Sequence, residues 1–139
     1  MDEAAQPTDA DYRTLLAFRS NLRRFLHWSE QRAADAGLAP AQYQLLLAVR
    51  GHDGPSGPTI GEIANYLSVR HNSAVGLVDR TVAAGLVARA TDGARASVVH
   101  VQLTDLGRER LASLAAVHLE ELARIAPVMQ EIWAALGER

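Results

Sequence analysis

Arg70, His71, Asn72 and Ser73 follow one another where one predicted helix ends and the next begins. Their side chains carry hydrogen-bonding groups that suit a nucleic acid. An asparagine amide can pair with adenine, a serine hydroxyl can serve a base or a phosphate, and an arginine can hold the phosphate backbone. Asn72 and Ser73 have a second interpretation, because both residue types are common at the starts of helices. Residue type alone leaves the two roles open.

The segment 59–103 contains the elements that would position these side chains. It reads as a helix, a short turn, a second helix, a strand, a glycine-bearing tip and a strand. Thr59 and Glu62 have the spacing of a capping box at the start of the first helix. Gly85 suits the left-handed position that ends the second helix. This order predicts a winged helix-turn-helix, whose second helix enters the major groove of DNA.

Apolar spacing predicts the buried face of the second helix. Val75, Val78 and Val82 recur at helical spacing, and Leu77 lies beside them. We expect these side chains to pack against the rest of the domain.

Further helices are predicted on the N-terminal side. Residues 12–36 read as one long amphipathic helix. Residues 40–51 read as a second helix, which opens at Pro40 and closes at Gly51. The glycines and prolines of 51–58 predict a loop.

The C-terminal segment 105–136 is also amphipathic, and Thr104 is suited to cap its first turn. Pro127 breaks or kinks it. Because a proline removes a helical hydrogen bond, we expect a long helix followed by a short one. Its apolar stripe, at three- and four-residue spacing, comprises Leu111, Leu114, His118, Leu122, Ile125, Met129, Ile132 and Leu136.

Two long amphipathic helices at opposite ends of a short chain need a surface to pack against. We expect helices 12–36 and 105–136 to form a dimer interface with a second copy about a two-fold axis. In such a dimer the second helix of the helix-turn-helix in one copy would lie about one DNA turn, roughly 34–36 Å, from the same helix in the other copy. This spacing would match a pseudo-palindromic operator. The alternative is a monomer whose terminal helices pack on one another.

Composition indicates one domain, residues 1–139, with its DNA-binding region at 40–103. The chain is 48% hydrophobic and has a net charge of −2, so binding to DNA depends on local charge. It has no cysteine, which excludes disulfides and thiolate metal sites, and no lysine, which excludes lysine-based catalysis. No signal-peptide pattern or membrane-length apolar run is present, and we expect a soluble cytoplasmic protein.

Five stretches of the chain resemble the MarR-type (multiple antibiotic resistance) transcriptional regulators. They are 36–42 (AGLAPAQ), 59–64 (TIGEIA), 71–80 (HNSAVGLVDR), 85–87 (GLV) and 103–107 (LTDLG). Their order and spacing are similar to the family's over essentially the whole chain. The resemblance implies a mainly α fold with a small β-hairpin wing, in which N- and C-terminal dimerisation helices flank a winged helix-turn-helix core. It also implies a homodimeric cytoplasmic regulator, usually a repressor, that small aromatic or amphipathic compounds often release from DNA.

The resemblance further implies a set of DNA-binding residues. The positions that it places at the groove are Arg70, His71, Asn72, Ser73 and Gly76. Asp79 corresponds to the family's aspartate that braces the wing. Arg80 is expected to contact a phosphate or Asp79 rather than a base.

The predicted wing departs from the family pattern. Strands are predicted at 86–90 and 97–103, joined by the tip 91–95. The family commonly has Asp-Arg-Arg before the second strand, where this chain has Arg-Ala-Ser from Arg95 onward. Either Arg95 reaches the minor groove from a shifted position, or the wing contributes little to binding. Asp79 would then also lack its usual partner.

Aromatic residues on the first two helices suggest an effector pocket. Phe25, Trp28 and Tyr43 could line it, together with His118, which interrupts the C-terminal apolar stripe. Plain core packing is the favoured alternative for the aromatics, and a hydrogen-bonded interface residue is the favoured alternative for His118. The histidines are scattered, with no H-x-x-x-H pair, so no metal or other cofactor is expected. A metal-responsive regulator stays an alternative.

Motifs that would indicate an enzyme are missing from the chain. It contains no G-x-S-x-G, no H-E-x-x-H and no phosphate-binding loop. A winged helix that binds only proteins is the remaining alternative. That function predicts an apolar or acidic second helix, whereas this one starts with arginine, histidine, asparagine and serine.

Overall fold

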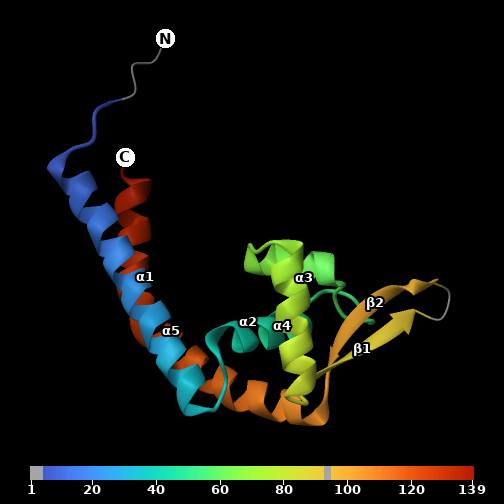
Figure 1. Cartoon of the computed structure of the whole chain (residues 1–139). Helices are drawn as coiled ribbons and strands as arrows, with labels where there is room; N and C mark the ends of the chain where they lie inside the picture. The colour runs from blue at the N-terminus through green and yellow to red at the C-terminus, as the bar shows by residue number, and fades with distance from the viewer. Residues whose placement is uncertain (1–4, 93–94) are drawn as a thin grey trace.

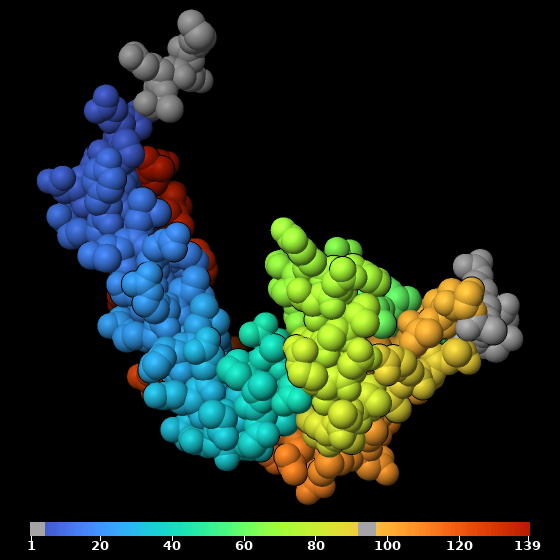
Figure 2. Space-filling model, viewed as in Figure 1, coloured from blue at the N-terminus to red at the C-terminus, as the bar shows by residue number. Residues whose placement is uncertain are grey.

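The computed structural model describes residues 5–92 and 95–139, apart from the side chains of residues 92, 95 and 96. Figure 1 shows two parts: a lobe made of α2, α3, α4 and the β1–β2 hairpin, and an arm in which α1 runs beside the C-terminal part of α5. Figure 2 shows the arm projecting away from the lobe, with a hollow between the two. The elements are α1 (Asp9–Asp35), α2 (Pro40–Gly51), α3 (Ile60–Leu67), α4 (His71–Ala83), β1 (Val87–Asp92), β2 (Arg95–Leu103) and α5 (Asp105–Gly137).

Local capping signals determine where several helices begin. The predicted capping box of α3 is confirmed, since the Thr59 hydroxyl accepts from Glu62 N–H at 3.2 Å and Glu62 accepts from Thr59 N–H at 3.1 Å. Helix α2 has the predicted bounds. Helix α1 begins three residues earlier than predicted, because Thr8 and Asp11 form a second capping box. The T-x-x-D spacing carried that signal.

The predicted break at Pro127 is wrong. Helix α5 continues through this proline as a single helix to Gly137. A proline in a helix leaves the carbonyl four residues earlier, here that of Ala123, without its donor. Both Pro127 and Ala123 are exposed, so water can satisfy that carbonyl. Packing of α5 along α1, with the rings of Phe18 and Trp133 centred 5.7 Å apart, holds the helix together across this point.

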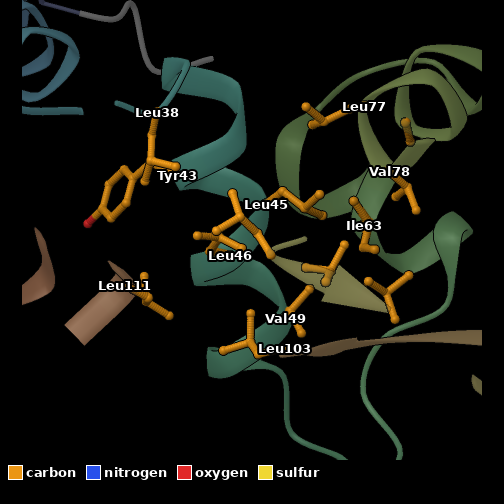
Figure 3. Packing of buried hydrophobic residues seen from close by; sticks show 14 of the residues in the cluster. Leu38, Tyr43, Leu45, Leu46, Val49, Ile63, Leu77, Val78, Leu103 and Leu111 are labelled. Atoms are coloured by element: carbon orange, nitrogen blue, oxygen red, sulfur yellow. The ribbon is translucent and has the colours of Figure 1, made fainter. Parts of the chain in front are cut away.

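The core of the lobe is centred on α2. Leu45 and Leu46 are fully buried, and Figure 3 shows them between Leu111 of α5 on one side and Ile63 and Val78 on the other. Residues from α2, α3, α4, the hairpin and α5 thus share one apolar cluster. The lobe therefore holds α4 on a rigid base.

The buried face of α4 agrees in part with the prediction. Ala74, Leu77, Val78 and Thr81 are buried, whereas Val75 and Val82 are only partly buried. Thr81 was not among the residues predicted to pack. In the structure its hydroxyl donates to the Leu77 carbonyl at 2.7 Å, so the group can be buried without losing a hydrogen bond. Leu77 and Val78 are therefore buried as predicted, Val82 packs against the core while partly buried, and Ala74 and Thr81 complete the face.

The turn after α4 starts the hairpin. Gly85 has φ +77°, a left-handed conformation that glycine adopts without steric cost. Its N–H donates to the Val82 carbonyl, and the N–H of buried Leu86 donates to the Thr81 carbonyl. These two bonds are those of a Schellman motif, as predicted for Gly85. Strands β1 and β2 then pair antiparallel, from Val87 opposite Leu103 outward.

Among the described residues, no helix is long and apolar enough to cross a membrane.

Candidate nucleic-acid interface

The first turn of α4 exposes the polar run noted in the sequence. His71, Asn72 and Ser73 are exposed, as is the N-cap residue Arg70. Within the described part of the chain, no side chain caps this helix, so Asn72 and Ser73 do not have the capping role. The first N–H that bonds within the helix is that of Ala74, to the Arg70 carbonyl. The N–H groups before it and the polar side chains therefore face outward together, which is an arrangement that suits anionic phosphates.

Gly76 and Arg80 continue this surface along the helix. A Cβ atom on Gly76 would lie 3.2 Å from Nη1 of Arg80. The guanidinium group of Arg80 therefore lies against Gly76, one turn nearer the polar run than its own backbone. Arg80 is exposed, and the glycine leaves room for this orientation.

Asp79 has a partner that the sequence analysis missed. Its carboxylate accepts a hydrogen bond from Arg89 of β1, and the two groups form an ion pair. Arg89 rather than Arg80 is thus the partner of Asp79, and the expected contact of Arg80 with a phosphate stays a prediction. The available signal was that β1 follows α4 directly, which brings an early side chain of the strand back beside the helix. The pair joins the candidate recognition helix to the wing.

The tip of the hairpin falls partly outside the described residues. The backbone of Arg95 pairs with Asp92, with a register shift between Thr91 and Asp92. The side chain of Arg95 lies outside the described residues, as do Gly93 and Ala94. The minor-groove role of Arg95 accordingly stays a prediction.

The residues expected at an effector pocket lie together where α1, α2 and α5 meet. The ring of His118 is centred 4.5 Å from Tyr43, 4.9 Å from Trp28 and 6.1 Å from Phe25. Phe25 also stacks on Trp28. Burial raises the pKa of the Tyr43 hydroxyl. The cluster thus joins the arm to the lobe.

His118 is 6% exposed and hydrogen-bonded through both ring nitrogens. Nδ1 lies 2.8 Å from the Leu114 carbonyl oxygen, which can only accept, so Nδ1 carries the proton. In the neutral ring Nε2 then accepts from the Ser29 hydroxyl, 2.7 Å away. The hydrogen bonds expected of His118 are therefore confirmed, whereas its position at a dimer interface and its contact with a ligand stay predictions. Ser29 was not singled out in the sequence, where no local pattern relates it to a residue 89 positions away.

Space for a ligand lies beside this cluster. An apolar cavity of about 370 Å³ extends from Phe25 to Trp133 between α1 and α5, and a smaller one of about 220 Å³ includes Trp28 and Arg124. Both share Phe25. Volumes of this order suit small molecules.

The arm leaves much apolar surface uncovered. Phe18 and Phe25 of α1 pack against α5, but other apolar residues on both helices face outward. The large ones that are exposed are Tyr12, Leu15, Leu16, Leu22 and Leu26 of α1 and Leu106, Val117, Leu119, Leu122, Val128, Trp133 and Leu136 of α5. Exposed apolar area of this extent is typical of an interaction surface.

Metal-ligating side chains do not gather in the described residues. No group of three or more histidine or carboxylate side chains there could hold a metal ion.

Comparison with known proteins agrees with this geometry. Residues 36–96 match the model of the MarR family. A MarR family protein from Bacillus stearothermophilus superposes with a TM-score of 0.79 at 19% identity, covering 96% of this chain and 97% of that one. No curated protein matches the chain.

Two further structures are similar and contain ligands. A mutant of S. aureus MepR bound to an oligodeoxyribonucleotide has a TM-score of 0.66 at 17% identity, covering 96% of each chain. CouR from Rhodococcus jostii RHA1, bound to p-coumaroyl-CoA, has a TM-score of 0.71 at 20% identity, covering 95% of this chain and 93% of that one. At this level of identity the solved structures establish the shared fold.

Proposed function

We propose that this chain is a MarR-type winged-helix transcriptional regulator, acting as a homodimeric repressor which a small aromatic or amphipathic ligand releases from its operator. The family consists of regulators rather than enzymes, and the fold is the mainly α winged helix of the family. We place the dimerisation helices at 12–36 and 105–136 and the DNA-binding region at 40–103 of a single domain, acting in the cytoplasm where its DNA lies.

The open first turn of α4 is the observation that carries the proposal. Asn72 and Ser73 are exposed and are not used as caps, so their hydrogen-bonding groups are available to base edges. Arg70 and Arg80 flank them and suit phosphates, and His71 and Gly76 complete the surface. The Asp79–Arg89 pair supports a wing fixed relative to α4. Arg95 is the wing residue proposed for the minor groove.

Dimerisation is supported by the arm. Apolar side chains such as Leu15, Leu122 and Leu136 are exposed in one copy and would be covered by the same helices of a second copy. A two-fold axis through the arms would present two α4 helices to a pseudo-palindromic operator.

Release by a ligand is supported by the aromatic cluster. Phe25, Trp28, Tyr43 and His118 lie where the arm meets the lobe, beside cavities that reach Phe25. A ligand bound there would change the angle between the arm and the lobe. CouR, which has this fold, was solved with p-coumaroyl-CoA, so a fold of this kind can hold an aromatic acyl ligand.

Selection of genomic DNA by the purified chain, with and without aromatic acids, tests the proposal. We expect a pseudo-palindromic site to be enriched and an aromatic acid to reduce its recovery. Asn72→Ala should lose about 1–3 kcal/mol of discrimination at one base pair. Arg70→Ala should weaken binding to all sequences and lower the salt dependence by about one ion per chain.

Gln31→Ala, an exposed amide on α1, is the matched control and should leave the selected site unchanged. Enrichment of no sequence by the unmodified chain would contradict the proposal. An unchanged base preference in Asn72→Ala would remove Asn72 from the interface.

A further inference from the structure

A third cleft lies on the lobe, away from the aromatic cluster. It has a volume of about 410 Å³ and is formed by the end of α2, the loop that follows it, the end of β2 and the first turns of α5. Val49 and Leu103 form part of its apolar wall and lie side by side in Figure 3. Its charged lining residues are Arg50 from α2 and Arg108 from α5.

The two arginines are available to a ligand. In the described part of the chain, Arg50 forms no ion pair with a carboxylate. Arg108 contacts Asp105 at 3.0 Å, but the Asp105 side chain is fully exposed. An ion pair between exposed groups contributes little, so an incoming anion can replace Asp105 at small cost.

His52 and Glu62, near the cleft, are engaged on its α3 side. His52 lines the cleft, but its Nδ1 lies 2.8 Å from the Tyr66 hydroxyl and its Nε2 lies 3.4 Å from Glu62. The Glu62 carboxylate in turn accepts from the backbone N–H of Thr59, and this bond lowers the pKa of Glu62. The negative charge of Glu62 is thus held toward α3 by its own partners.

Hydrogen bonds between the loop and β2 preform the wall of the cleft. Val101 N–H donates to the Pro58 carbonyl at 2.9 Å, and the side-chain amide of Gln102 donates to the Ser56 carbonyl at 3.2 Å. At Gly57 a Cβ atom would lie 2.2 Å from the Val101 carbonyl oxygen, so the loop meets the strand in backbone contact. A preformed wall lowers the ordering cost of binding.

We propose that this cleft binds a small organic or inorganic anion through a carboxylate or phosphoryl group held between Arg50 and Arg108. The planar guanidinium group presents paired donors that match the oxygens of both kinds of anion. The volume is within the range of small-molecule sites. Because the lining residues come from α2, the loop, β2 and α5, a bound anion joins the base of the wing to α5. This site is separate from the α4 surface and from the aromatic cluster.

Titration of the ¹⁵N-labelled full chain with pyrophosphate and, separately, with succinate tests the site without DNA. We expect saturable amide shifts confined to residues 50–57 and 101–108 with at least one probe, and the stronger probe identifies the preferred group. Arg50→Ala and Arg108→Ala should each weaken binding at least about tenfold, since each removes a charge-assisted hydrogen bond. Arg110→Ala, an exposed arginine of α5 outside the cleft, is the matched control.

Asp105→Asn separates the proposal from simple loss of structure. Removing the competing carboxylate frees Arg108, so binding should tighten by about threefold. Equal weakening in Arg110→Ala would show general electrostatic attraction and overturn the proposal, as would the absence of saturable shifts with both probes. Weaker DNA binding by Arg50→Ala in the absence of either probe would assign the cleft to DNA phosphates instead. Because the titration uses no DNA, its failure leaves the proposed regulatory function intact.

Discussion

Arg89 on β1 and Asp79 on α4 form a hydrogen-bonded ion pair that links the wing to the helix with the exposed polar turn. The Asp79 side chain is 58% exposed and that of Arg89 is 37% exposed. An ion pair this accessible to water adds at most about 1 kcal/mol to stability. The ion pair matters for geometry, because it fixes the Arg89 side chain of the hairpin against the turn of α4 that contains Asp79.

Arg89→Ala is therefore expected to change the free energy of unfolding by less than about 1 kcal/mol. The same variant should weaken the free energy of operator binding by more than it weakens the fold. Denaturant unfolding and fluorescence anisotropy with operator DNA measure the two quantities. Asp79→Ala should act in the same way, and the double variant should be no worse than either single one. Additive losses in the double variant would show that the two residues act independently.

Leu122→Glu tests the proposed dimer. Burying a carboxylate without a partner in an apolar interface costs several kcal/mol, so the variant should be monomeric in light scattering, whereas the unmodified chain should have the mass of a dimer. Ser113→Glu, at an exposed polar position of the same helix, should stay dimeric. A folded monomer of the unmodified chain would remove the dimer from the proposal.

Gly107→Ala is expected to destabilise the fold. A Cβ atom there would lie 2.0 Å from the Leu86 carbonyl oxygen, so the first turn of α5 must move away from the start of the hairpin. That shift strains the bond from Thr104 N–H to the same carbonyl, and overpacking of this kind costs about 1–3 kcal/mol. Urea unfolding measures the loss. Gly137→Ala, where nothing lies within 4 Å of the new Cβ atom, should cost nothing.

Glu62 makes stability depend on acid pH. The backbone N–H of Thr59 donates to its carboxylate and lowers the pKa of Glu62 below its ordinary value of 4.5. A pKa lowered by folding adds stability above the unfolded value, and this stability is lost as the pH falls through the folded value. Glu62→Gln keeps an acceptor for Thr59 but no longer titrates, so its unfolding midpoint should fall less steeply below pH 4.5 than that of the unmodified chain. If the unfolding midpoint fell equally steeply with pH in Glu62→Gln and in the unmodified chain, the bond from Thr59 would not favour the charged form of Glu62 over its neutral form. Glu120→Gln, at an exposed position of α5, is the control.

Arg95→Ala tests the wing. Arg95 is the sole arginine or lysine from residue 90 to residue 102, and a guanidinium group gains most in a narrow, A·T-rich minor groove. We expect lower operator affinity with unchanged dimer mass, and a larger loss for operators with A·T-rich flanks than with G·C-rich ones. A change below about twofold on both flanks, which is small beside the 1–3 kcal/mol typical of a specific contact, would make the wing mainly structural.

Features that depend on a few neighbouring residues could be predicted from the sequence. The capping box of Thr59 and Glu62, the opening of α2 at Pro40 and the left-handed Gly85 each involve residues within one or two turns of each other. These side chains act on backbone groups close to them in the chain, so their roles can be predicted without knowing the fold. The order of such signals was also enough to predict a winged helix.

The errors arose where neighbouring elements overrule local preference. Pro127 would end an isolated helix, but packing along α1 and an exposed Ala123 carbonyl keep α5 continuous. Thr81 is polar by type, but a bond to the carbonyl one turn back lets it join the buried face of α4, where Val82 is only partly buried.

The sequence by itself determined the helix-turn-helix and hairpin order, the starts of α2 and α3 and the exposed polar turn at Asn72, because each follows from side chains close together in the chain. Only the tertiary structure decided which residues from distant parts of the chain come into contact. Asp79 meets Arg89 because β1 returns beside α4, and His118 meets Ser29 because the arm brings together residues 89 positions apart. Arg50 and Arg108 share a cleft for the same reason. Such pairs depend on the packing of whole elements, and no spacing within the sequence encodes that packing.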